Sequence, residues 1–113
     1  MSILKNIHNK EVLELKNQVE YADGQVVSKT LVQNAGVGIT LFAFAKGEGI
    51  STHESTGDAM VTALDGVGEI TIDDEKFTLK AGETIVMPAQ HPHAVYGTEN
   101  FKMLLVVSFP PQN

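Results

Sequence analysis

Two segments of the chain, each running from a glycine to a histidine between strand-like stretches, constrain the fold more than any other feature. The first begins at Gly47 and reaches His53, and the second begins at Gly82 and reaches His91 and His93. Glycine permits sharp bends, and the residues around each segment are typical of short strands. The pattern predicts histidines held between strands, with bends at the glycines.

From residue 26 onward the sequence is typical of a β-protein. Short runs rich in Val, Ile, Thr and Phe alternate with Gly, Pro, Asn and Asp, which are the residues that turns favour. About eight short strands are expected, at 26–33, 37–46, 59–64, 67–72, 76–79, 84–87, 93–96 and 101–108. Strands of this length and number favour a sandwich or barrel.

The strand expected at 37–46 has two apolar faces. Leu41 and Ala43 lie on one face and Phe42 and Phe44 on the other, because side chains alternate along a strand. We therefore expect this strand to be covered on both sides.

The chain reads as one domain with two short extensions. Residues 1–25 are expected to form an N-terminal arm or a short helix packed on the barrel, residues 26–109 the barrel, and residues 110–113 a tail. The apolar spacing within 11–21 fits a short helical turn and an extended arm equally well. The sequence has neither a signal peptide nor an apolar run near the roughly 20 residues of a membrane span, so a cytoplasmic protein without membrane contact is expected.

The composition of the chain limits the kinds of molecule that it is expected to bind. The chain has 113 residues, no cysteine and a net charge of −6, which excludes disulfides and argues against nucleic acid as a partner. All eight basic residues are lysines, so the planar fork with which arginine clamps carboxylates and phosphates is missing. A neutral or modestly polar ligand is therefore favoured over a strongly anionic one.

The first segment resembles the first motif of the cupin superfamily, whose members are small β-barrels with a site in the lumen. That motif contains a glycine, two histidines, a glutamate and a second glycine. In this chain Gly47, His53 and Gly66 match the motif, whereas Ser55 stands at the second histidine position and Ala59 at the glutamate position.

The second segment resembles the second cupin motif, which contains a glycine, a proline, another glycine, a histidine and an asparagine. Gly82, Pro88 and His93 match, while Gln90 replaces the inner glycine and Gly97 the asparagine. Together the two motifs imply a small single-domain cupin of the all-β class. Its expected architecture is a single jelly-roll, or double-stranded β-helix, barrel of about eight strands with an N-terminal arm.

The resemblance carries over only two of the family's metal-ligating residues, His53 and His93. His91 can supply a third ligand if residues 91–93 are extended, because residues two apart then face the same side, and Pro92 favours that conformation. Such a set suits one divalent transition metal: zinc, nickel, iron or manganese. A site without metal, in which the imidazoles bond to carbonyl groups or water, stays open as the alternative.

Two functions follow from this reading. The leading hypothesis is a binding protein that holds a small molecule in a lumen lined by His53, Met87, His91 and His93. The alternative is a metal-dependent cupin enzyme, akin to a dioxygenase, isomerase or decarboxylase, with His53, His91 and His93 as ligands. Whether the protein is an enzyme is left open, and no catalytic acid or base is identified.

A homodimer is also expected. The family resemblance points to it, and so does the amount of apolar surface that one thin barrel would leave exposed. The residues behind this second argument are Val26, Leu31, Phe42, Phe44, Leu104 and Val106.

Overall fold

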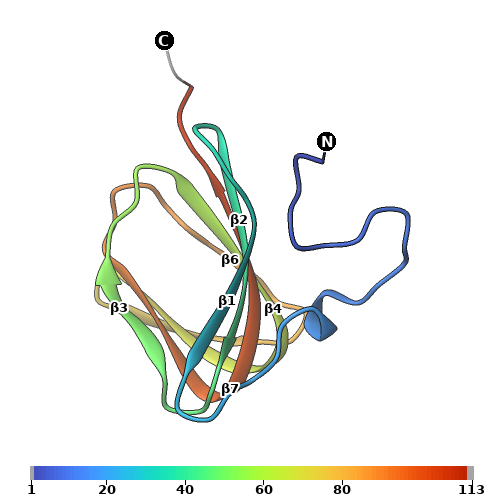
Figure 1. Ribbon diagram of the computed structural model, residues 1–113. Coiled ribbons are helices and arrows are strands. Elements are labelled where there is room, and N and C mark those ends of the chain that lie inside the picture. Colours follow the sequence, from blue (N-terminus) through green and yellow to red (C-terminus); the bar gives the residue numbers. More distant parts are fainter. Residues whose placement is uncertain (1, 112–113) are drawn as a thin grey trace.

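In the computed structural model, which describes residues 2–111, two long antiparallel strands run through both layers of a β-barrel (Figure 1). These are β4 (Asp58–Ile72) and β7 (His93–Ser108), which pair along their whole length from Asp58 opposite Ser108 to Ile72 opposite His93. The first half of β4 also pairs with β6 (Thr84–Met87), and its second half pairs with β5 (Glu75–Lys80). Each long strand therefore contributes to both layers.

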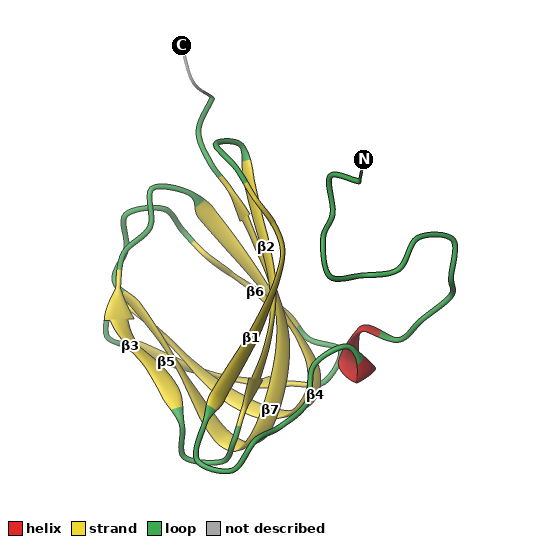
Figure 2. Ribbon diagram, in the orientation of Figure 1, coloured by secondary structure: helices red, strands yellow, loops and turns green. Residues whose placement is uncertain are grey.

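The remaining strands extend the two layers at β7 (Figure 2). The hairpin of β1 (Val26–Gln33) and β2 (Val37–Phe44) pairs with the C-terminal half of β7 through β2. The short strand β3 (Gly49–His53) pairs with the N-terminal half of β7. All seven strands pair antiparallel, which confirms the expected all-β cupin jelly-roll.

The structure has seven strands instead of about eight, because two pairs of expected strands are each continuous while one further strand, β3, is present. The expected breaks near residues 65 and 98 are bends within continuous strands, since the pairing of β4 shifts register around Gly66 without leaving the sheet. Gly66 adopts a φ of 73°, which glycine tolerates. Strand β3 was not expected, because Ile50 is the one large apolar side chain in an otherwise small and polar stretch.

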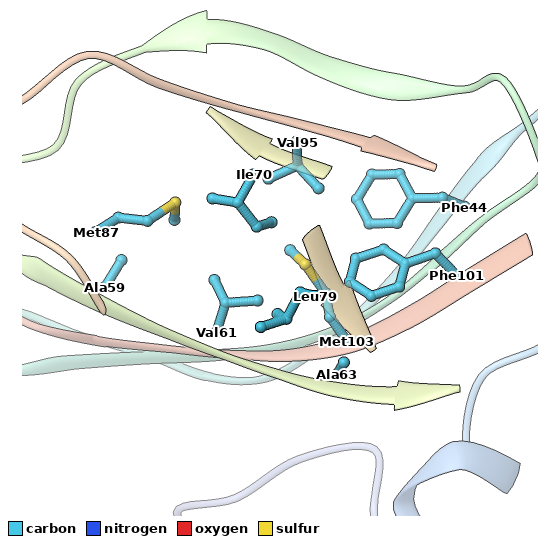
Figure 3. Packing of buried hydrophobic residues seen from close by; sticks show 10 residues of the cluster. All are labelled: Phe44, Ala59, Val61, Ala63, Ile70, Leu79, Met87, Val95, Phe101 and Met103. Carbon is cyan, nitrogen blue, oxygen red and sulfur yellow. The ribbon is translucent and has the colours of Figure 1, made fainter. Parts of the chain in front are cut away.

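The core lies between the two layers (Figure 3). Phe44 and Phe101 are fully buried, and their rings stack with centroids 5.8 Å apart. Figure 3 shows Met87 and Ala59 at the opposite end of this core from the two rings. The other buried members of the cluster are Val61, Ala63, Ile70, Leu79, Val95 and Met103.

A second apolar cluster covers the outer face of β1 and β2, where the N-terminal arm packs. Val19, from the arm, is 4% exposed and packs with Leu31, Leu41 and Ala43. The arm contains one 3₁₀ turn, η1 (Leu15–Asn17), and otherwise lacks regular structure within residues 2–25. Strand β2 is thus covered on both sides, as its two apolar faces predicted.

Polar contacts hold the arm in place. The Lys102 ammonium group donates to the carbonyl oxygen of Lys16 at 2.6 Å and lies 4.8 Å from the centre of the Tyr21 ring. The Tyr21 hydroxyl donates to Asp65 at 2.6 Å. Burial, and then the bond to the Asp65 carboxylate, raise the pKa of Tyr21 well above its ordinary value.

The apolar residues that suggested a dimer are largely covered within one chain. Phe44 lies in the core, Leu31 lies in the cluster under the arm, and Phe42 faces an internal cavity. Leu31 and Phe44 therefore leave little surface for a partner, whereas Phe42 is half-buried. The homodimer itself stays a prediction.

No helix within residues 2–111 is long and apolar enough to cross a membrane. Of the predicted arm and tail, residues 1, 112 and 113 lie outside the described part of the chain.

Candidate functional site

A cavity of about 440 Å³ opens at the Met87 end of the core. Its walls come from both layers, and most of them are apolar. The apolar lining residues are Phe42, Ile50, Ala59, Met87, Val95, Met103, Leu105 and Val107. Cavities of this size and character are typical of small-molecule sites.

Polar groups gather on one side of the cavity. They come from the end of β3, from the loop that follows it and from the start of β7, namely His53, Glu54, Ser55, Thr56 and His93. Among the described residues that line the cavity, Glu54 is the one carboxylate, and none is a lysine. The site therefore offers hydrogen-bond acceptors and no cationic side chain of fixed charge.

His53 and His93 are brought together by the pairing of β3 with β7. The two residues are directly opposite each other in the antiparallel ladder, where side chains are close neighbours. Their Nε2 atoms are 3.1 Å apart and their rings meet edge to face, with centroids 4.3 Å apart. Both residues line the cavity, but His53 is exposed whereas His93 is only 2% exposed.

Each ring is oriented by a backbone carbonyl two residues before it. The Nδ1 atom of His53 is 3.0 Å from the oxygen of Ser51, and the Nδ1 atom of His93 is 3.1 Å from the oxygen of His91. A carbonyl oxygen only accepts, so each Nδ1 atom is placed to donate to the carbonyl beside it. Burial, and then the neighbouring His53, lower the pKa of His93, although the His91 carbonyl and Glu54 act the other way.

The structure does not bring His91 to the other two histidines. Its exposed ring points away from the cavity, with Nδ1 3.0 Å from the Asp73 carboxylate. The expectation that residues 91 and 93 share a face assumed an extended segment, but β7 begins only at His93. The preceding turn, in which Gln90 has a φ of 65°, lies outside the regular strand geometry.

The other expected site residues fall into two groups. Met87 lines the cavity and pairs with Ala59 across β6 and β4. Ser55 and Ala59, which stand at the positions of two family ligands, also line it. Within residues 2–111, no group of three His, Asp or Glu side chains is arranged to hold a metal ion.

Sequence reasoning missed most of the apolar wall. Met103, Leu105 and Val107 all face the cavity from β7, and the alternation of residues 101–108 could have identified them once the inward face was known. Phe42 could have been identified in the same way, because it lies on one of the two apolar faces of β2. Ile50 had none, because β3 was not expected.

Comparison with solved structures places this geometry among known proteins. A protein of unknown function from Streptococcus pyogenes, SPY1581, is 50% identical, with a TM-score of 0.97 and an alignment covering 99% of this chain and 98% of that one. A cupin superfamily protein from Desulfitobacterium hafniense, DSY2733, is 37% identical, with a TM-score of 0.91 and coverage of 96% and 100%.

Comparison of sequences gives the family. An uncharacterised protein of Methanocaldococcus jannaschii, MJ1618, is 37% identical over 57 residues, which are 50% of this chain and 46% of that relative. The chain thus matches less than half the length of this curated relative. Residues 40–109 match the cupin domain family. Since that match covers well over half of the 113 residues, the chain belongs to the cupin domain family.

Proposed function

We propose that this cupin binds a small, neutral, mostly apolar molecule in the cavity between its two layers. The observation that carries the proposal is the cavity itself: about 440 Å³, walled by apolar side chains and flanked by one pair of histidines. Apolar sites with a few convergent polar groups are the usual form of small-molecule sites.

The charge of the lining supports a neutral ligand. An anion would meet the Glu54 carboxylate without a lysine among the described lining residues, and the chain contains no arginine. A buried charge without a partner is costly, so an anionic ligand is disfavoured.

The test uses two substitutions at adjacent positions of β7 whose side chains point to opposite faces. Val107 lines the cavity, whereas Val106 does not. We expect 2-naphthol, followed by its own fluorescence at neutral pH, to bind the wild-type protein and Val106→Phe alike and to bind Val107→Phe at least tenfold more weakly. The anion 2-naphthoate should bind poorly to all three.

Two results would contradict the proposal. One is the absence of 2-naphthol binding to the wild-type protein. The other is equal binding to both phenylalanine variants when their far-ultraviolet circular dichroism shows the same fold, because the bound dye would then lie outside the cavity.

A metal-dependent enzyme is a second candidate, since two imidazole nitrogens approach each other to 3.1 Å at the cavity. Such a pair suits a transition metal in ligand type. It falls short in number, because catalytic sites of this class use three protein ligands and His91 is held by Asp73. The donor set of the described residues therefore does not fit a resident metal.

Elemental analysis decides between the two functions. The protein should be purified without an affinity tag and compared with His53→Ala and with His8→Ala, which changes an exposed histidine of the arm. Substoichiometric metal in all three supports the binding function. A stoichiometric metal that His8→Ala keeps and His53→Ala loses would replace it with the enzyme.

A further inference from the structure

Ser55 places a neutral hydrogen-bond donor at the cavity. It lies in the loop between β3 and β4, is half-buried and lines the cavity. Its hydroxyl oxygen accepts the backbone N–H of Gly57 at 3.1 Å. A hydroxyl group carries one proton besides its lone pairs, and within residues 2–111 the Ser55 hydroxyl donates to no acceptor. That proton is therefore left for water or for a bound molecule.

Hydrogen bonds on both sides of Ser55 fix the loop that carries it. The Ser55 carbonyl oxygen accepts the backbone N–H of Gln90 at 2.8 Å, and the Asp58 carboxylate accepts that of Ala89 at 2.8 Å. These two bonds join the loop to the turn between β6 and β7, which lies beside it in Figure 1. A donor that is held in place before binding loses little freedom when it bonds to a ligand.

Gly57 brings the loop close to the apolar wall. A Cβ atom at this position would lie 2.6 Å from the Ser108 carbonyl oxygen and 2.8 Å from a methyl group of Val107, which lines the cavity. Glycine allows this approach because it has no Cβ atom. The backbone of Gly57, whose N–H donates to Ser55, therefore packs directly against β7.

Ser55 is better placed than its polar neighbours to bond to a neutral ligand. Thr56 also lines the cavity, but it is exposed, so water competes for its hydroxyl group. Glu54 is exposed as well, and a carboxylate only accepts hydrogen bonds. The half-buried Ser55 hydroxyl lies nearer to the dry wall, where a hydrogen bond to a ligand is less weakened by solvent.

We propose that Ser55 donates a hydrogen bond to a carbonyl oxygen of the bound molecule, while the rest of the molecule lies against the apolar wall. This inference rests on the proposed binding function and narrows it to one ligand class: neutral molecules with an apolar body and an acceptor oxygen, such as ketones, esters and amides. Ser55 stands at the position of a histidine in the first cupin motif, so this position recognises a neutral oxygen instead of holding a metal ion.

The experiment compares 2-acetylnaphthalene with 2-isopropenylnaphthalene, in which a CH₂ group replaces the carbonyl oxygen and the shape is kept. Both dissociation constants are measured by equilibrium dialysis with ultraviolet absorbance, for the wild-type protein and for Ser55→Ala. The two probes differ in hydration, but that difference cancels when the two proteins are compared. We expect Ser55→Ala to bind the ketone about three- to tenfold more weakly and the alkene within about twofold of the wild type, as the loss of one neutral hydrogen bond predicts.

Two further variants assign the effect to the hydroxyl group. Ser55→Thr keeps a hydroxyl at the same position and should restore the affinity for the ketone. Ser51→Ala removes an exposed hydroxyl of β3 that is not part of the lining, and should leave both affinities unchanged. Infrared difference spectroscopy gives a second readout: the carbonyl stretch of the bound ketone should lie at lower frequency in the wild-type protein than in Ser55→Ala, because a hydrogen bond to the oxygen weakens the C=O bond.

The outcomes separate this inference from the function on which it rests. A ketone affinity and a carbonyl frequency that Ser55→Ala leaves unchanged would overturn the inference. An equal loss of affinity for both probes would also overturn it, because a disturbed loop would then account for the effect. In either case, binding that Val107→Phe still blocks would leave the proposed function standing. If neither probe binds the wild-type protein, the proposed function fails and the inference fails with it.

Discussion

The N-terminal arm makes the sharpest prediction about stability, because two of its valines have opposite surroundings. Val19 is 4% exposed and packs in the cluster on the outer face of β2, whereas Val12 is fully exposed at 103%. The same substitution to alanine at both positions therefore isolates the effect of packing. Both residues lie outside regular structure, so a difference in helix or strand propensity does not enter.

The magnitude follows from the atoms removed. Val19→Ala deletes two methyl groups, each worth about 0.8 kcal/mol when buried. The small cavity left behind raises the loss to about 2 kcal/mol in the free energy of unfolding. Val12→Ala removes no buried surface, so its effect should stay within about 0.5 kcal/mol.

Urea unfolding followed by far-ultraviolet circular dichroism measures both values. With a slope of about 1–3 kcal/mol/M for a domain of this size, Val19→Ala should lower the midpoint by about 1 M at an unchanged slope. Equal midpoints for the two variants would refute the reasoning, since the arm would then not be packed on the barrel in solution. A lower midpoint with a smaller slope would mean that the arm unfolds before the barrel.

Two further predictions concern the bend in β4 and the arm. Gly66→Ala should lower the free energy of unfolding by about 3 kcal/mol or more, because a φ of 73° is strained for alanine and the new Cβ would overlap the Asn100 carbonyl. Gly82→Ala, at a φ of 91° with open space around it, should lower it by only about 1 kcal/mol. Equal urea midpoints for the two variants would contradict this. Folding raises the pKa of Tyr21 above its ordinary 10.0. The protonated hydroxyl group therefore contributes fully to the free energy of unfolding below about pH 10, and this contribution is lost at higher pH, where the unfolded chain releases the proton. The melting temperature should therefore fall more steeply above pH 10 in the wild type than in Tyr21→Phe, and parallel profiles would contradict this.

The barrel could be predicted because its determinants are local. Alternation and turn residues locate most strands to within a residue or two. Asp73, in the turn between β4 and β5, adopts a left-handed φ of 55°, which aspartate tolerates. Strand β3 could not be predicted, because a mostly exposed strand lacks the alternation of apolar and polar residues by which strands are recognised.

The site was only half predictable because its decisive contacts join distant residues. His53 and His93 were identified from motif positions, but their 3.1 Å contact depends on the register between β3 and β7. The position of His91 differs from the expected one because the turn before β7 does not follow the geometry of an extended segment. Nothing in the sequence signalled that Tyr21 would bond to Asp65, 44 residues away.

The two departures from the first cupin motif, Ser55 and Ala59, affect both metal binding and the chemistry of the cavity. Ala59 is 2% exposed and lines the cavity beside Met87, at the position of the family's glutamate. A carboxylate there would be buried among apolar walls and would be costly without a cation beside it. Alanine removes both that cost and a ligand, and Ser55 replaces a further imidazole with a small neutral group. Each change that weakens a metal site thus makes the cavity a better host for a neutral molecule, so the two candidate functions compete for the same positions. If the glutamate and the second histidine were restored within the same apolar wall, the buried carboxylate would destabilise the protein whenever the metal was absent.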